Sequence, residues 1–210
     1  MAVRVLIADD HALIRESFRA LLERRGYEVA GEAVNGQDAV RLARELKPDV
    51  ALIDLSMPLL NGVDAGREIL RAHKDVHVVL LTMHAEGHLM AAALRAGIRA
   101  YVLKSQPTED LVLAIRAVMR RQMYLSPELS QFAVDACVNG DAASPCPLAR
   151  RERQVLQLVA EGKTSKEIGV VLGVGTKTAE SYRARVMKKL DIHDIAGLVR
   201  YAIREGMVQA

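Results

Sequence analysis

The chain has 210 residues, half of them hydrophobic, with 29 Lys and Arg against 26 Asp and Glu and a formal net charge of +3. This length allows one or two domains with real hydrophobic cores. The apolar segments stop well short of the roughly 18 residues that a membrane span needs, so we expect a cytoplasmic protein without membrane contact. Two cysteines, Cys137 and Cys146, are too few for a disulfide framework and are expected to be reduced thiols.

The charge is divided unevenly along the chain. Residues 147–210 contain 12 Lys and Arg against 7 Asp and Glu, a net charge of +5, whereas residues 1–146 have a net charge of −2. A mildly acidic body with a small basic tail is typical of a tail that binds a polyanion such as nucleic acid. A solvated basic surface would give the same count.

Residues 1–124 alternate between short apolar segments and amphipathic ones. The apolar segments predict strands at 3–8, 28–33, 50–53, 77–81 and 100–103. The segments between them predict helices ending near Gly26, at 36–46, 63–72 and 87–95, and a last helix over 108–121. Strands that alternate with helices form a parallel sheet with right-handed crossovers. The predicted fold class is therefore α/β, a doubly wound sheet of five parallel strands, followed by a small all-α domain.

Polar side chains follow four of the predicted strands. Asp9 and Asp10 end the first, Asp54 the third, Thr82 the fourth and Lys104 the fifth. In a parallel sheet these strand ends point the same way, so the side chains should converge on one crevice. Taken alone, Asp54 could simply be an aspartate that forms a turn.

Three carboxylates at close range require a compensating cation. Mg²⁺ bound by oxygen ligands is the natural candidate, and an ammonium and a hydroxyl beside it would suit a phosphoryl group. Asp54 is then the nucleophile that accepts the phosphoryl group. Asp10, with Asp9 behind it, holds the metal, while Thr82 and Lys104 neutralise the phosphoryl oxygens.

Residues 1–122 resemble the receiver domain of two-component response regulators. The resemblance rests on the acidic pair, on Asp54 followed by Met57-Pro58 and Gly62, on Thr82, and on the segment Ala100–Lys104. It implies that a histidine kinase phosphorylates the central aspartate. It also implies that Mg²⁺ is bound by Asp9, Asp10, Asp54 and the backbone carbonyl of Ser56, and that Tyr101 is a switch residue that follows Thr82 inward. His11 could be a further metal ligand, but a histidine in the first turn of a helix at the rim of the site is the more ordinary interpretation.

The remaining chain is predicted to be a linker and a helical domain. Residues 125–146 begin with a short helix and end in turn-forming residues without periodicity, which favours a flexible linker. Residues 147–210 predict helices at 149–161, 166–172, 176–190 and 194–204. The second and third are joined by the turn Gly173–Gly175, which is typical of a helix-turn-helix that places its second member in a DNA major groove.

The segments 148–156, 160–168 and 176–183 resemble a LuxR-type helix-turn-helix, and with the receiver they are similar to the NarL/FixJ subfamily. The sequence departs from that pattern at Gly169, Gly175, Ala179 and Tyr182, which puts its base preference in doubt. The resemblance implies that Lys177, Glu180, Ser181 and Ala184 face base edges and that Tyr182, Arg183 and Arg185 lie nearer phosphates, with Thr178 and Lys188 in the same DNA-binding set. A solvated basic helix would show the same charge pattern.

These features predict a two-component response regulator that binds Mg²⁺, is phosphorylated on Asp54 by a histidine kinase, and binds DNA to regulate transcription. The last helix has more apolar residues than a domain of this size must bury, although all of them could pack inward: Ile195, Leu198, Val199, Ala202 and Ile203. The resemblance implies that this helix pairs two copies into a homodimer. Two alternatives stay open. One is a phosphatase that uses Asp54 as its nucleophile, and the other is a receiver that binds DNA without phosphorylation.

Overall fold

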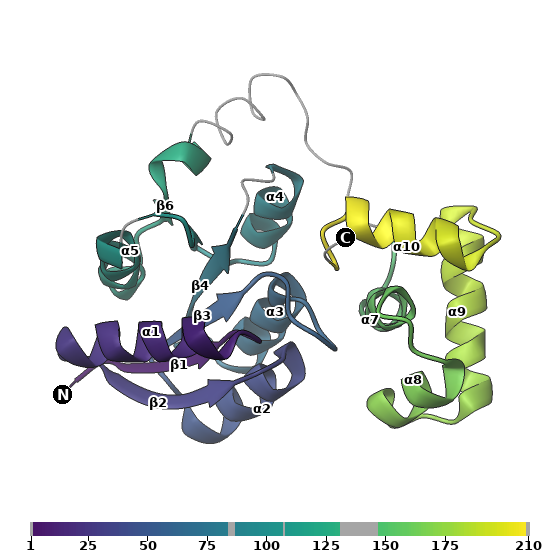
Figure 1. Ribbon diagram of the computed structural model, residues 1–210, viewed down its shortest axis with the longest axis horizontal. Helices are drawn as coiled ribbons and strands as arrows, with labels where there is room; N and C mark the ends of the chain where they lie inside the picture. The colour runs from purple at the N-terminus through teal and green to yellow at the C-terminus, as the bar shows by residue number, and fades with distance from the viewer. Residues whose placement is uncertain (1, 84–86, 107, 131–146, 209–210) are drawn as a thin grey trace.

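The computed structural model describes residues 2–83, 87–106, 108–130 and 147–208 (Figure 1). Most of the predicted linker, including Cys137 and Cys146, lies outside the described residues. The N-terminal part is an α/β domain, and the C-terminal part is a smaller bundle of helices beside it.

The N-terminal domain is built on one sheet of six parallel strands in the order β2-β1-β3-β4-β5-β6. Ile53 pairs with Ala8 on one side and with Leu80 on the other, so the carboxyl ends of β1 and β3 lie next to each other. The strand order reverses at β1, where open sheets of this kind form a crevice. The strands are β1 Arg4–Ala8, β2 Glu28–Ala33, β3 Val50–Asp54, β4 His77–Thr82, β5 Ala100–Leu103 and β6 Tyr124–Leu125.

The sheet has a sixth strand, β6, beyond the five that the sequence predicts. β6 pairs with β5, and Ser126 follows it as a fully buried residue whose hydroxyl accepts a hydrogen bond from the Leu103 amide at 3.2 Å. Leu129 is also fully buried. The first residues of the predicted linker therefore pack onto the N-terminal domain.

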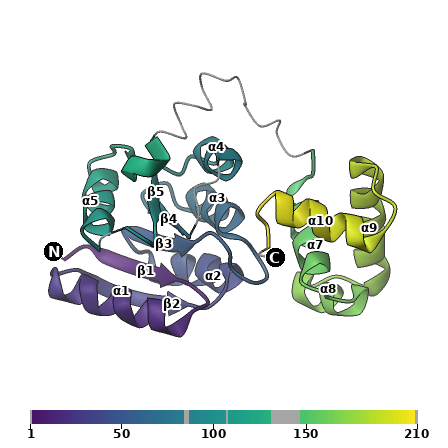
Figure 2. The same ribbon diagram turned by 45° about the horizontal axis from the view of Figure 1, so that its top comes forward.

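Helices cover both faces of the sheet (Figures 1 and 2). α1 Ala12–Arg24 and α5 Thr108–Met119 pack on one face. α2 Gly36–Leu46, α3 Gly62–Ala72 and α4 Gly87–Arg95 pack on the other. The side chains of Asn35 and Asn61 accept hydrogen bonds from amides in the first turns of α2 and α3, which fixes where these helices begin.

The C-terminal domain consists of α7 Arg150–Ala160, α8 Ser165–Leu172, α9 Thr176–Leu190 and α10 Ile195–Arg204. Thr164 and Glu167 form a capping box at the start of α8, and Gly173 ends that helix with a φ of +66°. The core of the domain includes the fully buried residues Val155, Leu156 and Leu198. In both views α7 faces the N-terminal domain and α9 lies on the far side (Figures 1 and 2).

Within the described ranges, no helix combines the length and apolar character needed to cross a membrane.

Candidate functional site

The structure brings three of the predicted site residues into direct contact at the carboxyl edge of the sheet. The Lys104 ammonium lies 2.6 Å from a carboxylate oxygen of Asp9 and 2.8 Å from one of Asp54. All three side chains are at most 5% exposed. Asp9 and Asp54 come from adjacent strands and Lys104 follows β5, so the convergence expected from a parallel sheet is present.

Burial has opposite consequences for the charges at this centre. Burial raises the pKa of Asp54 above its ordinary value, and the nearby Lys104 offsets only part of that increase. For Lys104, burial opposes the charged form, but Asp54 and Asp9 outweigh it, so the lysine pKa is raised and its ammonium is retained. The site thus holds a permanent cation beside a carboxylate that another cation would stabilise further.

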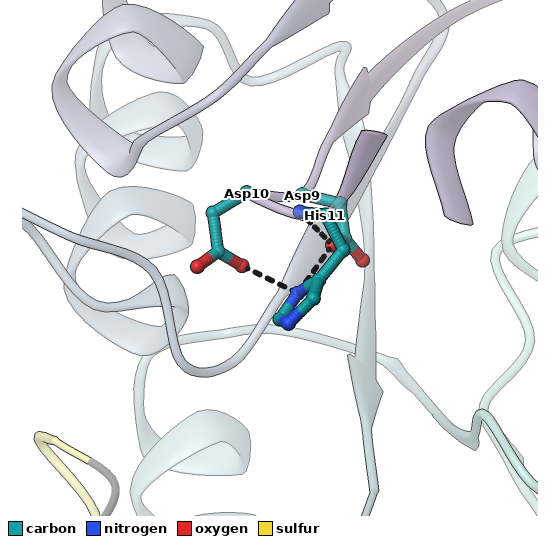
Figure 3. A group of neighbouring side chains, drawn as sticks. All are labelled: Asp9, Asp10 and His11. Atoms are coloured by element: carbon teal, nitrogen blue, oxygen red, sulfur yellow. Dashed lines mark hydrogen bonds and ion pairs between the residues drawn. The ribbon is translucent and has the colours of Figure 1, made fainter. Parts of the chain in front are cut away.

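Asp10 and His11 form the outer part of the acidic cluster (Figure 3). The His11 ring Nδ1 lies 2.9 Å from Asp10 and 3.4 Å from Asp9, and the His11 amide donates to Asp9 at 2.9 Å. The possible ligand atoms of these three residues lie within 4.8 Å of one another. Carboxylates that converge in this way suit a hard divalent cation such as Mg²⁺. The histidine side chain is 60% exposed and stands at the rim of the crevice.

The other three predicted site residues differ in their burial: Thr82, Tyr101 and Ser56. Thr82 is buried, and its carbonyl accepts a hydrogen bond from the Lys104 amide at 2.7 Å. Tyr101 is only 2% exposed and packs in the core cluster on the α3 and α4 face of the sheet. Ser56 is partly exposed and lines a cavity of about 350 Å³ together with Asp10. The cavity therefore opens directly beside the acidic cluster.

The helix predicted to read DNA, α9, presents most of its predicted contact residues to solvent. Ala179 and Val186 pack into the core, which fixes the helix on its other face. The exposed face combines cationic, polar and small side chains, as a surface that enters a DNA groove requires. Its exposed members are Lys177, Thr178, Glu180, Ser181, Ala184, Arg185 and Lys188.

Several aromatic and cationic residues of α9 have additional contacts within the domain. Tyr182 is half-buried against the core, and the Arg185 guanidinium lies 4.4 Å from its ring centre. Arg183 is also half-buried. Lys189 binds Glu152 of α7 at 2.7 Å, so its charge is directed toward the domain and not outward.

Sequence reasoning missed a group of polar residues that join the two domains. Gln157 and Glu161 from the end of α7 bond the loop that follows Asp54. Arg153 of α7 lies 2.7 Å from Asp64 of α3. These pairs are about 90 to 100 positions apart in the chain, and no local pattern distinguishes such residues from ordinary polar positions on helix surfaces.

Comparison with protein families gives two matches. Residues 5–116 match the family described as "Response regulator receiver domain". Residues 146–202 match the family described as "Bacterial regulatory proteins, luxR family". The first covers strands β2 to β5, nearly all of β1 and the acidic cluster, and the second covers α7 to α9 and most of α10.

Full-length relatives and solved structures agree with these matches. The chain is 37% identical to "Response regulator UvrY" of Escherichia coli K12 over 99% of this chain and 97% of the relative. It is also 37% identical to "Response regulator GacA" of Pseudomonas aeruginosa, over 99% of both chains. A solved structure of RcsB from Salmonella enterica serovar Typhimurium, bound to promoter rprA with the phosphomimetic BeF3-, is 27% identical. The structural match covers 96% of this chain and 98% of the RcsB chain, with a TM-score of 0.64.

Proposed function

Since the chain belongs to the two-component response regulators that join a receiver domain to a LuxR-type DNA-binding domain, we propose that phosphorylation of Asp54 controls its dimerisation and DNA binding. The phosphoryl donor would be a sensor histidine kinase. Members of this family regulate transcription and are not enzymes, which sets the phosphatase alternative aside. A cytoplasmic location would place the protein where such a kinase and DNA are both accessible.

The site residues support distinct roles in this reaction. A carboxylate oxygen of Asp54 attacks the phosphorus of a phosphohistidine, a P–O bond forms, the P–N bond breaks, and the histidine leaves. Asp9, Asp10, Asp54 and the Ser56 carbonyl would hold Mg²⁺, which supplies charge neutralisation at the phosphoryl oxygens. Lys104, already beside Asp54, would pair with one of those oxygens.

Two further residues would report the phosphorylated state. Thr82 stands at the end of β4, next to the strand that carries Asp54, and would donate its hydroxyl to a phosphoryl oxygen. Tyr101 would follow this movement as a switch residue. The observation that carries the whole assignment is the contact of the buried Asp54 with Lys104 at 2.8 Å, beside an acidic cluster at the edge of the sheet.

Labelling with a small phosphoryl donor tests this assignment. We expect acetyl phosphate with Mg²⁺ to add one phosphoryl group to the protein by mass, and EDTA to prevent it. Asp54→Ala should abolish the label, whereas Asp75→Asn, which changes an exposed aspartate, should keep it. Labelling of the Asp54→Ala protein would contradict the assignment of Asp54 as the phosphoacceptor. Labelling without a metal ion would contradict the proposed role of Mg²⁺.

DNA binding is proposed to use α9, with two copies on a two-fold site. RcsB is described bound to promoter DNA, and another structure holds two RcsB dimers on two parallel DNAs. In this chain, Ile195 and Ile203 of α10 are 54% and 36% exposed and could pair with a second copy. Leu198 and Ala202, which the sequence also suggested for this face, are fully buried in the domain core. The pairing surface is therefore narrower than the sequence indicated.

The proposed division of the chain is a receiver over residues 1–124, a linker over 125–146 and a DNA-binding domain over 147–210. The packing of Ser126 and Leu129 onto the receiver supports extending that domain by a few residues, to about residue 130.

A further inference from the structure

The backbone of Asp9, the first residue of the acidic pair, is held from two sides. Its amide donates a hydrogen bond to the Ala33 carbonyl of β2 at 3.1 Å. Its carbonyl accepts one from Nη1 of Arg15, in the first turn of α1, at 2.9 Å. Asp9 is fully buried, so neither bond can be replaced by water without opening the structure. A neighbouring strand and a helix side chain therefore fix this residue together.

The Arg15 side chain is itself held in one orientation by Glu32 of β2. Its Nε donates to one oxygen of the Glu32 carboxylate at 3.2 Å, and the other oxygen lies 2.6 Å from Nη2 of Arg19. The side chains of Arg15 and Glu32 are 14% and 25% exposed. A guanidinium is planar and its N–H groups point in fixed directions. The ion pair with Glu32 therefore aims the N–H group that bonds the Asp9 carbonyl.

The carbonyl that Arg15 bonds belongs to the peptide group that joins Asp9 to Asp10. Because a peptide group is planar, the direction of its carbonyl also sets the positions of the Asp10 amide and Cα. The Asp10 side chain is 31% exposed, and its carboxylate contacts the ring of His11, which is 60% exposed (Figure 3). Such an exposed contact holds the Asp10 carboxylate only weakly. Its position therefore depends on the backbone that Arg15 fixes.

The start of α1 provides little other support for this peptide group. Within the described part of the chain, the His11 side chain caps none of the α1 amides. A cation in the first turn of a helix is unfavourable for the helix dipole, and the ion pair with Glu32 offsets this cost for Arg15. An arginine at this position thus suits its bond to the Asp9 carbonyl better than it suits the helix.

We propose that Arg15, oriented by Glu32, is a positioning residue for the Mg²⁺ site, because it fixes the peptide group between Asp9 and Asp10 and with it the Asp10 carboxylate. This inference rests on the proposed function, since it takes the acidic pair as metal ligands. In this role Arg15 acts through the backbone and touches neither the metal ion nor the phosphoryl group. Groups that orient metal ligands from behind typically contribute about 10–100-fold to metal affinity.

A role of Arg15 through its charge alone would have the opposite effect on Mg²⁺ binding. A guanidinium near the acidic pair repels a divalent cation, so removing it for reasons of charge would tighten Mg²⁺ binding. Removing a residue that positions Asp10 weakens Mg²⁺ binding, because the ligand is then no longer held in place. The direction of the change in affinity therefore separates the two roles.

A Mg²⁺ titration of the full-length protein, followed by NMR at the Asp10 and His11 amides, tests the proposal. Arg15→Met keeps an unbranched apolar stem and removes the donors, and we expect it to weaken Mg²⁺ binding about tenfold or more. Arg19→Met is the matched control. It removes an equal charge from Glu32 but leaves the bond from Arg15 to Asp9, so Mg²⁺ affinity should stay nearly unchanged.

Amide hydrogen exchange without metal gives a second readout, at the His11 amide that donates to the Asp9 carboxylate. Arg15→Met should speed this exchange about tenfold, as loss of a local contact does, while the β3 amides exchange as in the wild type. Arg15→Lys keeps the charge without the fixed N–H directions, so it should also weaken Mg²⁺ binding and serves if Arg15→Met does not fold.

Mg²⁺ binding by the Arg15 variants that is unchanged or tighter than in the wild type would overturn the proposal. A faster exchange spread evenly over β3 and His11 would also overturn it, because that pattern indicates a general loss of stability. A wild-type protein that does not bind Mg²⁺ would count against the metal site of the proposed function. The exchange of the His11 amide would then still decide whether Arg15 fixes the acidic pair.

Discussion

The Lys104 ammonium lies 2.8 Å from the carboxylate of Asp54, and each side chain is only 5% exposed. The same ammonium lies 2.6 Å from Asp9, so one cation is shared by two buried carboxylates. Because this compensation is incomplete, burial leaves the pKa of Asp54 above its ordinary value. Without a bound metal ion, the ionised Asp54 side chain therefore lowers the stability of the folded protein. This loss of stability can be measured.

Asp54→Asn should raise the free energy of unfolding by about 1–2 kcal/mol at pH 7 in the absence of Mg²⁺, the scale of relieving an incompletely paired buried charge. A raised folded-state pKa contributes stability that is complete below the unfolded value of 3.8 and is lost as the pH rises through the folded value. The advantage of the variant should therefore disappear near pH 4 and below. Urea unfolding at several pH values measures this, with Asp75→Asn as control. A less stable Asp54→Asn protein at pH 7 would contradict the account.

Glu152→Gln should destabilise the DNA-binding domain. Burial disfavours the charged form of Glu152 and would raise its pKa. The hydrogen bonds from Lys189 and from the Ala149 amide stabilise the charged form more strongly, so the pKa of Glu152 is lowered. That stability is present above the unfolded value of 4.5 and is lost as the pH falls through the lower folded value. We expect a loss of about 1–2 kcal/mol at pH 7, measured by thermal unfolding. The difference from wild type should shrink under acidic conditions; a loss that stays the same across this range would exclude the charge as its cause.

The two glycines at which the helix-turn-helix departs from its family should respond in opposite ways. A Cβ at Gly169 would lie 2.8 Å from the Val174 carbonyl oxygen, so the glycine permits the turn to pack closely against α8. Gly169→Ala should therefore destabilise the domain, although alanine gains about 1 kcal/mol of helix propensity. Gly175 has open space around it and begins α9, so Gly175→Ser should add a few tenths of a kcal/mol. Thermal unfolding of the two variants measures both effects. If Gly169→Ala stabilised the domain, the turn would have moved to make room for the added methyl group, and the prediction would be wrong.

DNA contacts of α9 should separate into two classes. Arg183→Ala should weaken binding to all duplexes alike and reduce the slope of log affinity against log salt by about 0.9. Glu180→Ala and Ser181→Ala, which change exposed residues on the expected base-facing side, should alter sequence preference instead. Titrations of a selected site and a random duplex at several salt concentrations measure both effects. Equal losses on both duplexes for the Glu180 and Ser181 variants would exclude base reading.

Much of the fold and the centre of the site could be predicted because the signals are local. The apolar run of β3 ends in Asp54, and parallel topology alone brings that residue beside Asp9 and Lys104. β6 has two residues, too few to show alternation, and was missed for that reason. The bonds from Gln157 to the loop join residues about a hundred positions apart, and nothing in an amphipathic helix indicates which polar residue another domain will bury.

The central claim is that phosphorylation at Asp54 controls DNA binding by the paired protein. It is tested most directly by titrating a selected two-fold DNA site with the full-length protein before and after acetyl phosphate treatment, with the phosphoryl content of Asp54 measured on the same samples. We expect phosphorylation to tighten binding by about tenfold or more, corresponding to roughly 1.4 kcal/mol, and Asp54→Ala to show no response. Equal affinity of the fully phosphorylated and unphosphorylated proteins would contradict the account.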